Sequence, residues 1–130
     1  MNDFDWKKLS NVALHLKVYS QEEEFQRSAV GRFYYSCFGL SREYFESTHH
    51  IFISSLDSHI ELIDYLENSV YDEENEIGEN LRKLRKIRNF ADYNNVFFIK
   101  NVDVSEDLSE DIISSIESLK LNPVVPKFSK

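Results

Sequence analysis

Residues 77–93 read IGENLRKLRKIRNFADY, and this stretch decides the fold that the sequence predicts. Successive residues of a helix are turned by about 100°, so one face of this segment is apolar. That face carries Ile77, Leu81, Leu84, Ile87 and Ala91, with Arg88 near its middle. Because a guanidinium keeps its proton, a buried arginine requires a carboxylate, a backbone acceptor, a wet cleft or an anionic ligand. The structural alternatives to an anion site are an ion pair with Asp92, four residues on, and a side chain that reaches solvent.

The composition favours helices throughout the chain. Of its 130 residues, three are glycine and two are proline, and both prolines lie near the C-terminus. Helix breakers are therefore almost absent from the rest of the sequence. With 42% hydrophobic residues, the chain can bury one core but is too short for two domains. We expect an all-α, up-and-down bundle of about five helices over residues 1–122, followed by a flexible C-terminal tail over residues 123–130.

Apolar spacing gives approximate bounds for the first three helices. The first should cover residues 6–18, the second and longest residues 21–46, and the third residues 54–68. Ser20 and Glu23 form a capping-box pattern, which should open the second helix.

Turn-forming and capping residues bound the last two helices. The basic helix should begin within the acidic stretch 71–79, where carboxylates favour a helix N-terminus. It should end near the asparagine pair at positions 94 and 95. Ser105 or Ser109 should cap the last helix, and Pro123 should follow its end.

The second helix is apolar on more than one face. Its main stripe consists of Phe25, Ala29, Phe33, Cys37, Leu40 and Tyr44. The pair Tyr34 and Tyr35 widens the apolar surface beyond that stripe, and such a helix is usually covered on several sides. The cover is either other helices of the same chain or a second subunit. We expect a homodimer, since the apolar surface around Phe33, Tyr34, Phe38 and Leu40 exceeds one stripe.

Charge is distributed unevenly along the chain. The net charge is −8, yet residues 80–101 carry six positive charges against one negative, which leaves −13 for the rest. An acidic body with one basic helix can steer a polyanion to that helix. Docking onto an acidic protein and a merely solvated charged face remain alternatives. Since no apolar run of about 18 residues and no apolar signal core are present, we expect a cytoplasmic protein without a membrane partner.

Common cofactor and metal motifs are missing. The sequence has no glycine-rich phosphate loop, no paired Cys-x-x-Cys, no His-Glu-x-x-His and no Gly-x-Ser-x-Gly. His49, His50 and His59, with Asp57, match no established ligand spacing, so we expect no metal and no cofactor. Cys37 lies in an aromatic stretch that is typical of a buried small hydrophobe.

Three segments together resemble HEPN-domain proteins, which are small helical bundles. These segments are RSAVGRFYYSCFGLSREYF at 27–45, DSHIELIDYL at 57–66 and LRKLRKIRNFADY at 81–93. HEPN sequences commonly combine a long helix bearing a tyrosine pair, a histidine before a mid-chain helix, and a late arginine motif. The resemblance covers roughly residues 25–95 and implies a HEPN-like bundle.

Many HEPN proteins are metal-independent ribonucleases, and their motif is an arginine and a polar residue with a histidine four to six positions on. Arg88 and Asn89 match its first part, while Asp92 and Tyr93 occupy the histidine window. The resemblance thus implies these four as catalytic candidates, with Arg88 on the scissile phosphate and the RNA 2′-hydroxyl as nucleophile. The remaining basic side chains of the helix, Arg82, Lys83, Arg85 and Lys86, are the RNA-binding candidates, and a two-fold dimer would join two such helices in one cleft.

The resemblance leaves two functions open. One is a ribonuclease-type toxin or antiviral defence effector that acts on RNA. The other is a non-catalytic HEPN module that binds a nucleotidyltransferase or another protein, and an unrelated helical adaptor is a third alternative. In toxin–antitoxin pairs of the superfamily, a nucleotidyltransferase antitoxin can attach AMP to the tyrosine that closes the motif, so Tyr93 is the candidate for modification.

Overall fold

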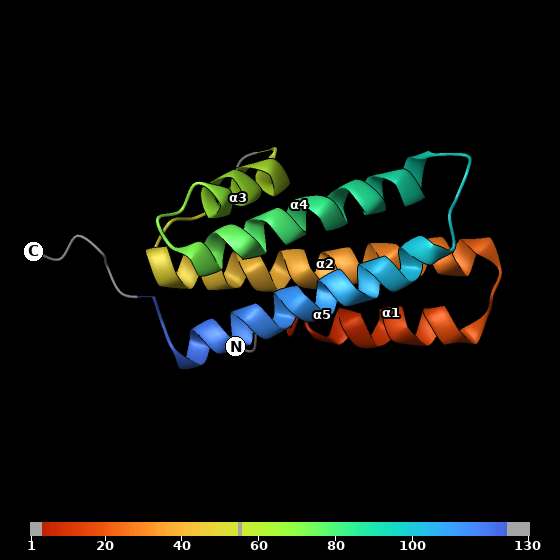
Figure 1. The fold of residues 1–130 in the computed structure, drawn as a ribbon, viewed down its shortest axis with the longest axis horizontal. Helices are drawn as coiled ribbons and strands as arrows, with labels where there is room; N and C mark the ends of the chain where they lie inside the picture. The colour runs from red at the N-terminus through yellow and green to blue at the C-terminus, as the bar shows by residue number, and fades with distance from the viewer. Residues whose placement is uncertain (1–3, 55, 125–130) are drawn as a thin grey trace, which may run out of the picture.

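A computed structural model describes residues 4–54 and 56–124. The described residues form five α-helices and no strand, so the predicted all-α bundle is confirmed (Figure 1). The helices are α1 (Lys8–Tyr19), α2 (Glu23–His49), α3 (Ser58–Glu67), α4 (Asp72–Tyr93) and α5 (Lys100–Leu121). Most of the expected C-terminal tail, residues 125–130, lies outside the described residues.

Helix α2 is the centre of the bundle. In Figure 1 it runs through the middle, with α3 and α4 on one side and α1 on the other, while α5 crosses it. Each of the other four helices contacts α2, and α3 and α5 also pack on α4. The apolar side chains expected at a dimer interface, Phe33, Tyr34, Phe38 and Leu40, are all buried within the single chain. Helices of the same chain therefore cover these four side chains. The inference that their apolar surface needs a second subunit was wrong.

The boundaries of α2 differ from the predicted ones at both ends. The helix begins at Glu23, and Ser20 Oγ accepts a hydrogen bond from the backbone N–H of Glu22 (3.1 Å) instead of closing a capping box. At the other end the helix continues to His49, three residues beyond the prediction. His50 ends it in the left-handed conformation (φ 57°), with its N–H bonded to the carbonyl oxygen of Glu46.

The third helix begins at Ser58, four residues later than predicted, because the chain before it is held in a loop. Ile53 is fully buried, and its backbone N–H donates to Glu46 Oε2 (2.8 Å). The carbonyl oxygen of Ile53 accepts from Arg42 (2.5 Å). Both backbone groups of Ile53 are thus satisfied by α2 side chains, which removes the need for helical hydrogen bonds there.

The last helix begins at Lys100, so the prediction that Ser105 or Ser109 caps it was wrong. Both serines lie inside the helix and are buried. The hydroxyl of Ser105 donates to the carbonyl oxygen of Asn101 (2.7 Å), one turn earlier, and this bond satisfies a serine within a helix. The end of α5 at Leu121, just before Asn122 and Pro123, agrees with the prediction.

Helix α4 ends at Tyr93, beside the asparagine pair as predicted, and Arg27 of α2 stabilises that end. Its guanidinium donates to the carbonyl oxygens of Ala91 (2.7 Å), Asn94 (2.6 Å) and Asn95 (3.1 Å). A cation beside the last carbonyls of a helix satisfies their acceptors and complements the helix dipole. The C-terminal turn of α4 is therefore anchored to α2.

Trp6, just before α1, packs directly on the backbone of α2 at Gly39. A Cβ atom added at Gly39 would overlap the Trp6 indole, whereas one added at Gly31, two turns earlier on α2, would meet nothing within 4 Å. Glycine at position 39 is thus required by a close approach, while at position 31 it only weakens the helix.

We predict opposite effects for alanine at these two glycines. Gly39→Ala should lower the free energy of unfolding by about 1–3 kcal/mol, because the indole must move out of its packed position. Gly31→Ala should raise it by about 0.5–1 kcal/mol, because alanine is the better helix former. Urea unfolding of both variants measures the difference, and equal effects at the two positions would contradict the Trp6–Gly39 packing.

Candidate functional site

Arg88 lies on the inward face of α4, where the sequence placed it, and is 9% exposed. Its Nη1 donates to Asn89 Oδ1 (2.6 Å) and its Nη2 donates to the Tyr35 hydroxyl oxygen (2.6 Å). Its Nε lies 3.4 Å from Asp92 Oδ2 but makes no hydrogen bond to any of the described residues. The ion pair with Asp92, which the sequence offered as a structural alternative to an anion site, is therefore present, but it leaves one buried donor of Arg88 unsatisfied.

The guanidinium of Arg88 also rests on the tyrosine pair of α2. Its Cζ lies 5.3 Å from the ring centroid of Tyr34 and 5.1 Å from that of Tyr35. The two rings meet edge to face, 5.3 Å apart. Aromatic faces attract a cation at these distances, and the attraction strengthens where water is excluded. The aromatic pair thus replaces part of the hydration that Arg88 loses.

Helix α3 brings His59 to the same tyrosine pair. His59 Nδ1 lies 2.6 Å from the Tyr34 hydroxyl, and the imidazole stacks on Phe38 with a centroid distance of 3.9 Å. Burial, followed by the positive charges of Arg85, Arg88 and Arg42, lowers the pKa of His59 to about 4. The imidazole is therefore neutral near pH 7.

Hydrogen-bond donors without a fixed acceptor converge around Arg88. Because Tyr35 and Asn89 use their oxygen atoms to accept from Arg88, the Tyr35 hydroxyl proton and the Asn89 amide protons can point elsewhere. Arg85, one turn earlier on α4, acts electrostatically on Tyr34 and His59, and its buried Nε has no hydrogen-bond partner among the residues that the structure describes. We call Tyr35, His59, Arg85, Arg88 and Asn89 the arginine cluster. This arrangement of donors and positive charge suits an anion.

The structure brings some of the predicted site residues together and separates others. Arg88, Asn89 and Asp92 meet as described above. Tyr93 is 80% exposed at the end of α4, and among the described residues no hydrogen bond or ring contact joins it to Arg88.

The four predicted RNA-binding side chains also divide. Arg82 forms ion pairs with Glu67 (2.8 Å) and Asp64 (2.9 Å), which link α4 to α3. Arg85 belongs to the arginine cluster. Lys83 and Lys86 are exposed on the outer face of α4.

Sequence reasoning missed Tyr35 and His59 as members of the site. His59 was grouped with His49 and His50, but the fold separates the three. His49 Nε2 bonds Glu74 (2.7 Å), and His50 ends α2 at the surface. The tyrosine pair and the histidine named in the HEPN resemblance were the available signal, although no spacing rule connects them to Arg88.

Within the described residues, no group of three or more histidine, cysteine, aspartate or glutamate side chains is arranged to hold a metal ion. None of the described helices is long and apolar enough to cross a membrane.

Comparisons with known proteins do not assign the chain to a family. No family model matches it, and neither the curated proteins nor the solved structures gave a match.

We predict that His59 makes folding stability depend on pH between about 6.5 and 4. The pKa of about 4 in the folded chain lies below the ordinary histidine pKa of 6.5, which we take for the unfolded chain. In that window the unfolded chain binds a proton that the folded chain does not, so the free energy of unfolding should fall as the pH is lowered. Above pH 6.5 this contribution should be flat.

Urea unfolding at pH 7.5, 6, 5 and 4 measures this dependence. The carboxylates titrate in every variant, so the informative quantity is the difference between wild type and His59→Gln, which should shrink as the pH falls. His15→Gln, on an exposed part of α1, should follow the wild-type curve. Parallel curves for wild type and His59→Gln would show that His59 titrates normally.

Proposed function

We propose that this protein is a HEPN-like, metal-independent endoribonuclease that acts in the cytoplasm as a toxin or defence effector. The observation that carries the proposal is the arginine cluster, in which Arg85, Arg88, Tyr35 and Asn89 present donors beside the neutral imidazole of His59. A phosphodiester is the anion that such donors suit, and a neutral imidazole can accept a proton. The resemblance to HEPN proteins points to RNA as the source of that phosphodiester.

The proposed reaction uses the RNA as its own nucleophile. The 2′-hydroxyl attacks the adjacent phosphorus, the bond to the 5′ oxygen breaks, and a 2′,3′-cyclic phosphate remains. His59 takes the 2′ proton, and the departing 5′ oxygen takes a proton from water. Arg85 and Arg88 stabilise the charge that develops on the phosphoryl oxygens.

We propose that His59 takes the role of the histidine that belongs to the HEPN ribonuclease motif and is missing after Asn89 in this chain. No histidine follows Asn89 in the chain, but α3 supplies an imidazole to the same tyrosine pair that holds Arg88. With a pKa of about 4 in the protein without bound RNA, His59 is a weak base. A phosphate bound between Arg85 and Arg88 would offset part of their charge, which would raise the pKa of His59 toward the range useful for proton transfer.

A second candidate function is a non-catalytic HEPN module that binds a nucleotidyltransferase or another protein. It is favoured by the exposed apolar side chains at the end of α4 and just after it, namely Tyr93, Val96, Phe98 and Ile99. Patches of this kind mark protein interaction sites. The exposed hydroxyl of Tyr93 would also be accessible to a nucleotidyltransferase antitoxin that attaches AMP.

The ribonuclease proposal predicts different effects for two neighbouring arginines. Arg85→Gln should weaken binding and cleavage of a single-stranded RNA at least about tenfold, because a charge-assisted phosphate contact contributes about 1.4 kcal/mol or more. Arg82→Gln removes the same charge from the same helix, but Arg82 is held by Glu67 and Asp64. It should lower stability and change RNA handling much less.

The assay contains EDTA, and the products are identified by mass as 2′,3′-cyclic phosphates. His59→Gln should bind the RNA but cleave it at least about tenfold more slowly. Equal loss with Arg85→Gln and Arg82→Gln would indicate non-specific electrostatics. Binding without cleavage by wild type would favour the non-catalytic module.

The proposal also includes a homodimer, whose interface lies around the start of α3 and not on the apolar surface of α2. Leu56 is fully exposed and Ile60 is 40% exposed, and both lie close in sequence to His59. A second copy that covers them would bring two arginine clusters toward one RNA. We expect light scattering at micromolar concentration to give twice the chain mass of 15.4 kDa. Leu56→Asp should shift the protein toward monomer, whereas Leu121→Asp, at the exposed end of α5, should not.

A further inference from the structure

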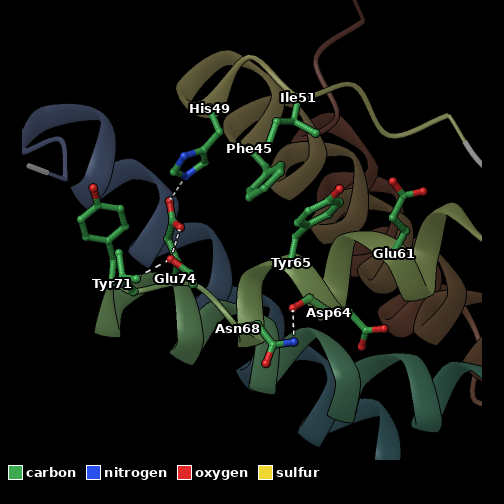
Figure 2. Close-up of a pocket in the computed structure, with 11 residues that line it drawn as sticks. Phe45, His49, Ile51, Glu61, Asp64, Tyr65, Asn68, Tyr71 and Glu74 are labelled. Atoms are coloured by element: carbon green, nitrogen blue, oxygen red, sulfur yellow. Dashed lines mark hydrogen bonds and ion pairs between the residues drawn. The ribbon is translucent and has the colours of Figure 1, made fainter. Parts of the chain in front are cut away.

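A cavity lies away from the arginine cluster, at the end of α2. It has a volume of about 660 Å³ and is formed by the end of α2, one face of α3 and the start of α4 (Figure 2). Its lining includes no residue of the arginine cluster. The size is within the range of small-molecule sites, which is about 300–1,000 Å³.

Four aromatic rings form a continuous wall of this cavity. Tyr65 and Phe45 lie 5.2 Å apart, Phe45 and His49 lie 4.7 Å apart, and His49 and Tyr71 lie 6.3 Å apart, measured between ring centroids. Figure 2 shows the rings of Tyr65 and Phe45 side by side, with His49 close to Phe45. Tyr65 is 41% exposed, so part of this wall is open to solvent.

The charged groups of the cavity are acidic. Glu61 and Asp64 come from α3 and Glu74 from α4, while His49 is the sole basic side chain among the lining residues that the structure describes. Asp64 is paired with Arg82, but no hydrogen bond or ion pair joins the Glu61 carboxylate to a described side chain. The cavity thus combines aromatic faces with uncompensated negative charge.

Glu74 fixes the inner end of the cavity. Its side chain is fully buried and accepts hydrogen bonds from the hydroxyl groups of Tyr44 (2.6 Å) and Ser69 (2.6 Å) and from His49 Nε2 (2.7 Å). These three donors hold the carboxylate in one orientation. They also hold His49 in place, so this end of the aromatic wall is rigid before any ligand arrives.

We propose that this cavity binds a small organic cation, specifically an ammonium group attached to an apolar or aromatic body. Aromatic faces and carboxylates both attract a cation, and the apolar body would fill the space beside Phe45 and Tyr65. An anion would be repelled by the Glu61 carboxylate, which no described cation neutralises. The proposal is independent of the ribonuclease proposal, because the two sites share no residue.

Three probes with the same phenylethyl body separate charge from hydrophobicity. They are 2-phenylethylammonium, the neutral 2-phenylethanol and the anionic 3-phenylpropionate. Titration calorimetry at low salt should show the ammonium binding at least about tenfold more tightly than the alcohol, with no binding of the carboxylate. Amide chemical shifts in NMR should locate the ammonium at residues 45–51 and 61–74.

Two variants test the residues that carry the proposal. Glu61→Gln keeps the shape of the side chain and should weaken binding of the ammonium about fivefold or more, and Tyr65→Ala should do the same by removing part of the wall. Glu24→Gln, an equal change of charge on the exposed N-terminal part of α2, should have no effect. Circular dichroism checks that all three variants fold.

Each other outcome overturns the proposal. Equal affinity for the ammonium and the alcohol would make the cavity a non-specific apolar site. Tighter binding of the carboxylate would reverse the inferred charge preference. Unchanged affinity in both Glu61→Gln and Tyr65→Ala, or chemical shifts confined to α4 around Arg88, would place the cation elsewhere.

Discussion

The bundle depends on covering the middle of α2 on every side. This helix has 27 residues, and residues 36–41 are all buried, whereas Ser28 and Arg32 in its N-terminal half are exposed. No single neighbour can cover such a helix, so α1, α5, α4 and α3 are arranged around it. Two close contacts set how near they come. The Trp6 indole lies on the backbone at Gly39, and Arg27 reaches across to the last carbonyls of α4.

The same requirement creates the arginine cluster. Where α4 crosses α2, the inward position on α4 is Arg88, and the facing surface of α2 is Tyr34 and Tyr35. The guanidinium is stabilised by aromatic faces and by oxygen acceptors, and the groups that accept from it have donors left for another partner. His59 completes the site, because α3 packs its inner face on the same rings. The groups that stabilise the buried guanidinium therefore keep donors that an anion can use.

Helix α3 is shared by the two sites of the molecule. Its inner face contributes His59 to the arginine cluster, while Glu61, Asp64 and Tyr65 line the acidic aromatic cavity. The two proposed sites therefore differ in charge, although one ten-residue helix contributes residues to both. Arg82 of α4 is joined to α3 by its ion pairs with Glu67 and with Asp64, a lining residue of the cavity.

The sequence by itself determined the all-α class, the approximate position of each helix and the inward direction of Arg88, because apolar periodicity is a local property. It offered the pair with Asp92 only as one alternative for Arg88, and the structure contains that pair. Tertiary structure alone decided the start of α3, since both backbone groups of Ile53 are bound by side chains of α2. It also decided that α2 is covered by its own chain and that His59 joins Arg88. His59 and Arg88 are brought together only because α3 and α4 both pack on one tyrosine pair of α2. Such contacts depend on how whole helices pack, and the periodicity along a single helix does not encode that packing.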